Sequence, residues 1–303
     1  MQTVGRFAPS PSGRMHLGNV LCALLAWLSA RHQNGAFLLR IEDLDAMRCP
    51  RSYADLIMDD LRWLGLDWDG EVPYQSERAP IYEKYEQILR EKGLLYPCFC
   101  SRAALHAASA PHLSDGRVLY AGTCRELTPA EIEEKRKKRA PATRVRVPDE
   151  IISFTDGVFG AYSENLAEEC GDFIIRRSDG VFAYQLAVTV DDGLSGVTEV
   201  VRGSDLISST PRQIWLQRQL GFPEPGYYHV PLLVAPDGRR LSKREKDLDM
   251  GALRNRYTPE QLLGMLAHAC GLLSHSESVR AGELAEEFSW QITKIRIHLN
   301  IKI

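Results

Sequence analysis

The chain has 303 residues, of which 44% are hydrophobic and 25% charged, as is ordinary for a globular protein. This length is sufficient to bury a large core and favours two domains. The net charge of −3 excludes a protein that attracts nucleic acid through its overall field, so such a partner would require a local basic face. No apolar run approaches the 18 residues of a membrane span, and we expect no membrane partner.

The N-terminal segment does not show a basic stretch followed by an apolar one, which is the pattern of a secretory signal. Together with the missing membrane span, this predicts a cytoplasmic protein. The cysteines are odd in number and scattered, which favours free thiols and a metal site over a disulfide framework. They are Cys22, Cys49, Cys98, Cys100, Cys124, Cys170 and Cys270.

Strands and helices alternate in the first part of the chain. The predicted segments are a strand over 3–9, a helix over 16–35, a strand over 36–43 and helices over 52–66 and 79–92. Gly35 is expected to close the first helix, Ser52 to cap the second and Gly93 to end the third. This alternation predicts a parallel sheet with crossover helices, and therefore an α/β fold.

From Tyr96 the sequence becomes rich in small and turn-forming residues, which indicates an insertion. A helix follows it, with Thr128 as N-cap, Pro129 at the first helical position and Glu131 completing a capping box. The later predicted segments are strands over 142–148, 171–180 and 181–192, with a turn at 178–180, a helix over 209–221, and a final helix over 258–273 with a Thr258–Gln261 capping box. No pattern places the segment after about Phe288.

The first chemical motif is His16-Leu17-Gly18-Asn19, which follows a turn-rich Pro9–Gly13 segment. It lies between a strand and the start of a helix, where unpaired backbone N–H groups and the helix dipole favour an anion such as a triphosphate. Gly18 would let a flat base approach the backbone, while His16 and Asn19 can donate hydrogen bonds to phosphate oxygens. These four residues alone fit an ordinary helix cap equally well.

The second motif is Arg240-Leu241-Ser242-Lys243-Arg244, which follows an Asp-Gly turn. A lysine on a short loop is a mobile positive charge that can meet the charge developing on a pyrophosphate leaving group. Taken alone, this motif fits a solvated basic turn better.

In this order, and separated by an α/β chain, the two motifs resemble the HIGH and KMSKS signatures of class I aminoacyl-tRNA synthetases. The departures, HLGN and RLSKR, retain the first histidine, the glycine and the second lysine. The resemblance implies that His16, Gly18 and Asn19 bind ATP, accompanied by Mg²⁺, and that Lys243 stabilises the transition state of adenylation. His16, Asn19 and Lys243 are then the catalytic residues.

Three further segments resemble the glutamate and glutamine subgroup of that family: 6–13 (RFAPSPSG), 38–45 (LLRIEDLD) and 200–206 (VVRGSDL). The resemblance implies glutamate contacts from Arg6, Ser10, Glu42, Tyr184 and Arg202. A glutamate site must hold one ammonium and two carboxylates, for which a carboxylate and two arginines are suited. Two arginines favour glutamate over glutamine. In isolation, each arginine also fits a surface ion pair, and the carboxylate a solvated strand end.

The cysteine cluster resembles a zinc site of some glutamyl enzymes, with Cys98, Cys100, Tyr120 and Cys124 as ligands. Thiolates on Zn²⁺ would stabilise a loop-rich insertion that buries little apolar surface, so the implied role is structural. His106 or His112 is an alternative fourth ligand to Tyr120, and unliganded buried cysteines are the remaining alternative.

The resemblance implies a Rossmann-type parallel sheet with an inserted zinc-binding α+β subdomain and a small C-terminal helical region. The predicted limits are 1–96 and 176–240 for the two halves of the Rossmann catalytic domain, 97–175 for the insertion, and 241–303 for the KMSKS-like loop and helical region. Only about 60 residues follow Lys243, so we expect no anticodon-binding domain.

A catalytic core without an anticodon reader resembles one branch, the glutamyl-queuosine tRNA(Asp) synthetases. This implies a monomer that activates glutamate with ATP without tRNA, then transfers it to the queuosine base in the anticodon loop of tRNA(Asp). No side chain stands out as a base for the transfer. The alternatives are a truncated glutamyl-tRNA synthetase that charges the 3′ end of tRNA(Glu), and a non-catalytic tRNA-binding paralogue.

Overall fold

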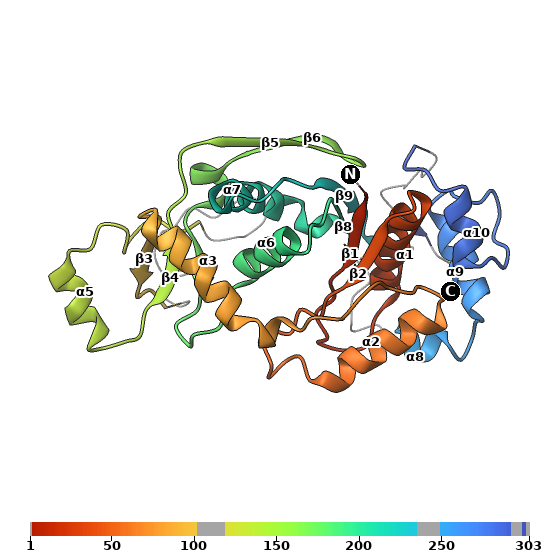
Figure 1. Cartoon of the computed structure of the whole chain (residues 1–303), viewed down its shortest axis with the longest axis horizontal. Helices are drawn as coiled ribbons and strands as arrows, with labels where there is room; N and C mark the ends of the chain where they lie inside the picture. Colours follow the sequence, from red (N-terminus) through yellow and green to blue (C-terminus); the bar gives the residue numbers. More distant parts are fainter. Residues whose placement is uncertain (1, 102–118, 235–248, 292–298, 301–303) are drawn as a thin grey trace.

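The computed structural model describes residues 2–101, 119–234 and 249–291, and the backbone of 299–300 (Figure 1). Its strands are β1 (Val4–Phe7), β2 (Ala36–Leu39), β3 (Leu95–Cys98), β4 (Ala142–Val145), β5 (Ile151–Asp156), β6 (Gly160–Asn165), β7 (Phe173–Arg176), β8 (Glu199–Gly203), β9 (Gly226–Val230), β10 (Leu233–Val234) and β11 (Leu299–Asn300). Its α-helices are α1 (Leu17–His32), α2 (Arg51–Trp63), α3 (Ala79–Glu91), α5 (Pro129–Arg136), α6 (Tyr184–Leu194), α7 (Thr210–Leu220), α8 (Met250–Leu253), α9 (Pro259–Ala269) and α10 (Ala281–Glu286).

A parallel arrangement of strands forms the centre of the molecule, as predicted. β1 pairs in parallel with β2, and β8 in parallel with β9. The two pairs meet where Thr198 N donates to Val4 O at 3.0 Å. β5 extends this arrangement beyond β9 and pairs with β6 in an antiparallel hairpin. The carboxyl ends of β1, β2, β8 and β9 therefore share one edge, where ligands bind in open α/β sheets.

Two large hydrophobic clusters enclose these strands. The first joins α1 to the C-terminal helices α9 and α10, which lie beside it in Figure 1, with Leu24, Leu262 and Leu284 among its members. The second joins α3, α6 and α7 to β5, β7 and β9. The central strands are thus covered by helices on both sides, which is what a parallel sheet requires.

The segment between the two halves forms its own antiparallel sheet in the order β3-β4-β7, with α5 beyond it in Figure 1. The Thr128 capping box of α5 is present, as predicted, and so is the Thr258 capping box of α9. The segment buries a small cluster around Tyr96 and Cys98. The domain limits given above stay a prediction.

The largest error of the sequence analysis concerns residues 181–192, which form the helix α6 rather than a strand. Only a bridge between Phe182 and Arg176 remains of the predicted pairing. Leu186 to Asp192 are all buried, so the helix lacks a solvent-exposed polar face, and its sequence could not be told from that of a buried strand. Strands β5, β6, β8 and β9 were not predicted, and α9 is followed by a further helix, α10.

Two helix ends differ from expectation. Pro50, not Ser52, precedes the first residue of α2, and no side chain caps that helix. α1 ends at His32, and the left-handed residue is Asn34 (φ 53°), not Gly35. Gly35 is required by a close approach, because a Cβ there would lie 2.4 Å from Thr3 O.

Candidate active site

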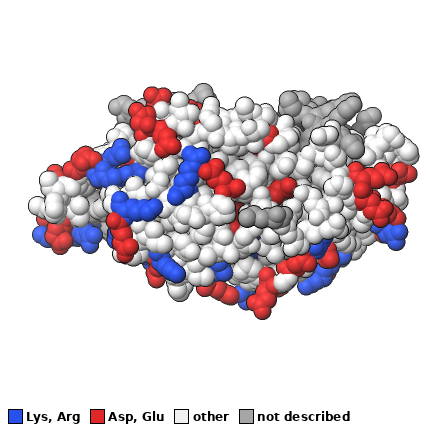
Figure 2. Space-filling view, turned by 45° about the horizontal axis from the view of Figure 1, so that its top comes forward, with Lys and Arg blue, Asp and Glu red and all other residues white. Residues whose placement is uncertain are grey.

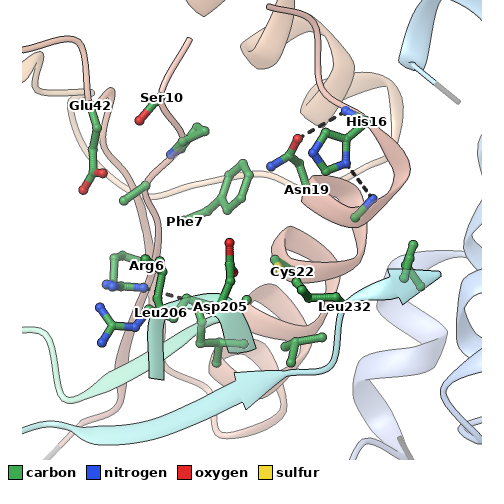
Figure 3. A pocket seen from close by; sticks show the side chains of 18 of the residues that line it. Arg6, Phe7, Ser10, His16, Asn19, Cys22, Glu42, Asp205, Leu206 and Leu232 are labelled. Atoms are coloured by element: carbon green, nitrogen blue, oxygen red, sulfur yellow. Dashed lines mark hydrogen bonds between the residues drawn. The ribbon is translucent and has the colours of Figure 1, made fainter. Parts of the chain in front are cut away.

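A cavity of about 370 Å³ opens at the carboxyl edge of β1, β2, β8 and β9, beside the start of α1. Figure 3 shows Glu42 and Arg6 on one side of it and His16 and Asn19 on the other. The cavity brings together every predicted substrate and ATP residue that the structure describes: Arg6, Ser10, His16, Gly18, Asn19, Glu42, Tyr184 and Arg202.

The His16–Asn19 motif forms the first turn of α1. His16 Nδ1 accepts the Gly18 backbone N–H at 3.1 Å, and Asn19 Oδ1 accepts the His16 backbone N–H at 3.2 Å. A Cβ on Gly18 would lie 3.0 Å from His16 Cε1, so the glycine lets the ring fold over the helix start. The motif is both a cap and a wall of the cavity, and the helix N-terminus it creates favours a phosphate.

Arg202, at the end of β8, is buried and faces the cavity. Its guanidinium donates to three neutral groups: His229 Nε2 at 3.1 Å, Gln213 Oε1 at 2.7 Å and Thr210 Oγ1 at 2.7 Å. No carboxylate of the described part of the chain forms an ion pair with it, although the other buried arginines on this side have one. A buried charge without a counter-charge is costly unless a ligand supplies one.

Glu42 belongs to a buried charge network that the sequence analysis missed. Arg40, on the strand segment before it, donates to Glu42 at 3.1 Å and to Asp192 at 2.7 Å. Asp192 also pairs with Arg6 at 3.3 Å, so one aspartate of α6 holds both arginines. The only sequence signal was the arginine inside the buried segment LLRIED, because Asp192 lay in a segment predicted as a strand.

Burial governs the protonation of this side of the cavity. It raises the pKa of Glu42, and Arg40 offsets only part of that rise. Burial also opposes ionisation of Asp192, but Arg40 and Arg6 outweigh it and hold its pKa below the ordinary value. Burial likewise raises the pKa of Tyr184, so its phenol is a neutral hydrogen-bonding group at the cavity wall.

The predicted Lys243 lies outside the described residues, but the flanks of its segment do not. Leu233 lines the cavity on one side of that segment. On the other side, Asp249 forms a bridge with His16, and Met250 N donates to Met15 O at 2.9 Å. Both ends of the segment therefore lie beside the His16 motif.

The predicted metal ligands also converge. The sulfur atoms of Cys98, Cys100 and Cys124 all lie within 4.8 Å of one another, and Tyr120 OH lies 3.6 Å from Cys98 Sγ. Burial would raise the pKa of Cys98, but hydrogen bonds from Arg144 and the backbone outweigh it and lower that pKa. Cys100 keeps a pKa raised to about 11 by burial and its thiol neighbours. His106 and His112 lie outside the described residues.

Comparisons with known proteins agree with this geometry. Residues 2–299 match the family of class I tRNA synthetases (E and Q), catalytic domain. A protein of Symbiobacterium thermophilum named glutamyl-Q tRNA(Asp) synthetase is 50% identical over 94% of this chain and 91% of its own length. A protein of Neisseria meningitidis with that name is 45% identical over 97% of each chain.

A crystal structure of a glutamate tRNA ligase from Elizabethkingia meningosepticum, in complex with its amino acid, superposes with a TM-score of 0.85 at 28% identity. The superposition covers 99% of this chain and 68% of the ligase chain. Among the described residues, no helix has the length and apolarity to cross a bilayer. The chain belongs to the class I glutamyl- and glutaminyl-tRNA synthetase family, in the group of ligases whose curated members are named glutamyl-Q tRNA(Asp) synthetase.

Proposed function

We propose that this protein, acting as a monomer, activates glutamate with ATP and transfers it to the queuosine base of tRNA(Asp). One observation carries the first half: Arg202 is a buried guanidinium at the cavity with no carboxylate partner among the described residues. A substrate carboxylate would supply the missing counter-charge. If the side-chain amide of glutamine took the place of that carboxylate, one N–H of Arg202 would lack an acceptor, at a cost of roughly 1–3 kcal/mol.

The remaining groups of a bound glutamate have suitable partners in the same cavity. Glu42 would accept the ammonium, since its Oε1 is already occupied by Arg40 and its second oxygen remains. Arg6 would bind the other carboxylate through the N–H groups that Asp192 and Val201 do not use. Tyr184 and Ser10 add hydroxyls to the wall. These arrangements are expectations about binding and follow from the donors present.

ATP would lie on the other side, with its phosphates near the start of α1 and close to His16, Gly18 and Asn19. The glutamate α-carboxylate oxygen then attacks the α-phosphorus, forming a new P–O bond while the bond to pyrophosphate breaks. Positioning and neutralisation of charge drive such a step. Lys243 and a Mg²⁺ ion held by the triphosphate would neutralise the leaving pyrophosphate.

For the second half we rely on the names of the relatives that match nearly the whole chain. A hydroxyl of the cyclopentene ring of queuosine would attack the activated carbonyl. An ester forms, the hydroxyl proton passes to water, and AMP leaves with the bonding electron pair of the anhydride. The rival acceptor is the 3′ end of tRNA(Glu), which the glutamate tRNA ligase structures suggest.

We also propose that Cys98, Cys100, Cys124 and Tyr120 hold a structural Zn²⁺. The donor set fits, because three thiols and a phenol converge from β3 and the segment before α5. Arg144 Nε lies 3.2 Å from Cys98 Sγ and would balance the excess negative charge of three thiolates. The ion would fix the fold of the insertion and take no part in the reaction.

Glutamate-dependent exchange between ATP and pyrophosphate, measured without tRNA, tests the first half. Labelled glutamate is then offered to tRNA(Asp) with queuosine, tRNA(Asp) with an unmodified guanine in its place, and tRNA(Glu). We expect exchange, and labelling of the first tRNA alone. Labelling of tRNA(Glu) alone would identify the rival acceptor, and absence of exchange would favour a non-catalytic tRNA-binding protein.

A further inference from the structure

Behind the Arg202 guanidinium lies a chain of buried polar groups from three strands. His229, on β9, is fully buried, and its Nε2 lies 3.1 Å from Arg202 Nε. Its other ring nitrogen, Nδ1, lies 2.6 Å from Asp156 Oδ2 at the end of β5. Asp156 is fixed in turn, because its Oδ1 accepts the backbone N–H groups of Val158 and Phe159 at 2.9 Å.

The ring partners of His229 determine which ring nitrogen carries the proton. Nε2 faces Arg202 Nε and, at 3.3 Å, Thr210 Oγ1, while Nδ1 faces Asp156. Arg202 Nε offers only a hydrogen, so His229 Nε2 must present its lone pair. The single proton of the neutral ring then lies on Nδ1 and is donated to Asp156. Burial lowers the pKa of His229, assisted by the nearby Arg202 and Arg6 charges and opposed by Asp156, so the ring stays neutral at pH 7.

This contact leaves Arg202 with a defined set of donors. A guanidinium has five N–H groups, and here three of them are used by His229, Gln213 and Thr210. One N–H remains on each terminal nitrogen. That pair can bind both oxygens of a single carboxylate, provided the guanidinium does not turn. The hydrogen bond from Nε to His229 holds the guanidinium plane together with the bonds to Gln213 and Thr210.

We propose that Asp156 and His229 are positioning residues that fix Arg202 for the side-chain carboxylate of the substrate and so determine the preference for glutamate over glutamine. The inference rests on the proposed activation of glutamate and extends it to specificity. Two fixed N–H donors match two carboxylate oxygens. Against the amide of glutamine, one of them faces another N–H, and an Arg202 free to turn would avoid that penalty.

Asp156→Asn tests the chain with almost no change of shape. The N–H groups of Val158 and Phe159 keep the asparagine oxygen in the place of Oδ1, where the His229 backbone N–H also contacts it at 3.3 Å. The amide nitrogen then takes the place of Oδ2, loses the 3.1 Å bond that Oδ2 accepts from the same backbone N–H, and faces His229 Nδ1. The amide donates there, the ring proton moves to Nε2, and two donors oppose each other at Arg202. We expect the KM for glutamate in exchange to rise about tenfold or more. The glutamate-to-glutamine ratio of kcat/KM should fall by a similar factor, with the KM for ATP within about twofold.

Two further substitutions separate orientation from folding. Glu199→Gln is the matched control, since Glu199 is a buried carboxylate at the other end of β8 whose partners are Ser29 and Gln33. It should leave both KM values and the ratio near those of the wild type. His229→Gln retains an acceptor for Arg202 Nε and should lower the ratio less than His229→Leu, which has none. Adding Asp156→Asn to His229→Gln should then change the ratio little.

The outcomes are distinct. A folded Asp156→Asn protein with the wild-type melting temperature, glutamate KM and ratio overturns the positioning role. If that variant does not fold, equal ratios in His229→Gln and His229→Leu overturn it instead. A wild-type protein without glutamate-dependent exchange overturns the proposed function together with this extension of it.

Discussion

Glu42 experiences two opposing influences. Burial raises its pKa, and the hydrogen bond from Arg40 lowers it again without cancelling the rise. A carboxylate must be ionised to bind an ammonium, so this raised pKa brings the loss of binding nearer to neutral pH than for an exposed glutamate. Arg40 therefore favours the charged form of Glu42, which the proposed binding of the ammonium requires.

We expect the KM for glutamate to rise as the pH falls toward the pKa of Glu42, because protonation removes the charge that faces the ammonium. Glu42→Gln should raise that KM about tenfold to a hundredfold and remove this acid dependence. Exchange kinetics as a function of pH, at saturating ATP, measure both effects. If the KM for glutamate still rises at low pH in Glu42→Gln, the titrating group is another residue.

The sequence predicted residues that line the cavity, but not the buried residues that contact and orient them. Arg6, His16, Glu42 and Arg202 were predictable as cavity residues because each lies in a short segment that resembles a motif of the synthetase family. Arg40, Asp156, Asp192 and His229 were not, because their importance comes from partners as many as 186 residues away in the chain. Such pairings depend on the assembled sheet and leave no local pattern.

Among the secondary-structure elements, α2 connects two segments that flank the predicted motifs. Asp60 of α2 is fully buried and accepts from Arg14, before the His16 motif, and from Arg254, after α8, both at 2.9 Å. One carboxylate thus joins the chain that precedes the first motif to the chain that follows the second. We infer that it maintains the distance between them.

Asp60→Asn should lower the free energy of unfolding by about 1–3 kcal/mol, the lower end being favoured because both arginines are partly exposed. The KM for ATP should rise severalfold, with the KM for glutamate little changed. Asp59→Asn is the control, because Asp59 also pairs with Arg254 but is exposed, and it should cost less than about 1 kcal/mol. Urea unfolding and exchange kinetics give both quantities, and equal effects of the two variants would refute the inference.

Helix α9 is packed against the segment that leads to α10 through a glycine. A Cβ on Gly264 would lie 1.6 Å from the backbone oxygen of Glu277, so Gly264→Ala forces the two apart. We expect a loss of about 1–3 kcal/mol in stability. Gly282, in α10, has open space around its Cβ position, and Gly282→Ala should be neutral or stabilising by up to about 1 kcal/mol. Thermal melting of the two variants compares them directly, and a harmless Gly264→Ala would contradict the packing.

The predictability of the elements followed the strength of their local signals. The helices α5 and α9 begin with complete capping boxes, which specify both type and start. α6 has no capping side chain to mark its start, and Leu186 to Asp192 are all buried, so it lacks the exposed polar face of a surface helix. The edge hairpin of β5 and β6 has a mixed sequence whose place is set by pairing with β9.

On the face of the molecule that Figure 2 shows, neither sign of charge dominates. Acidic and basic side chains are interspersed over the face shown in Figure 2, in keeping with the net charge of −3. A tRNA would therefore be bound through local contacts, and its affinity should depend on a few basic groups rather than on the overall field.

The stability of the insertion should depend on metal. We expect about one Zn²⁺ per chain, lost in Cys124→Ser together with a lower melting temperature. Cys170→Ser is the control, since that thiol lies outside the cluster and bonds to Gly171 O, and it should retain the metal. Elemental analysis with thermal melting measures both, and equal metal content in the two variants would exclude the site.

The junction between β1 and β8 has a consequence for synthesis. Val4 and Thr198 are 194 residues apart, yet their hydrogen bonds join the two halves of the sheet. During translation, the edge of β1 that meets Thr198 stays open until most of the chain has left the ribosome, and contacts between residues so far apart in the chain form slowly. The nascent chain is consequently most prone to aggregation before β8 emerges, and chaperones that shield exposed strand edges should matter most in that interval.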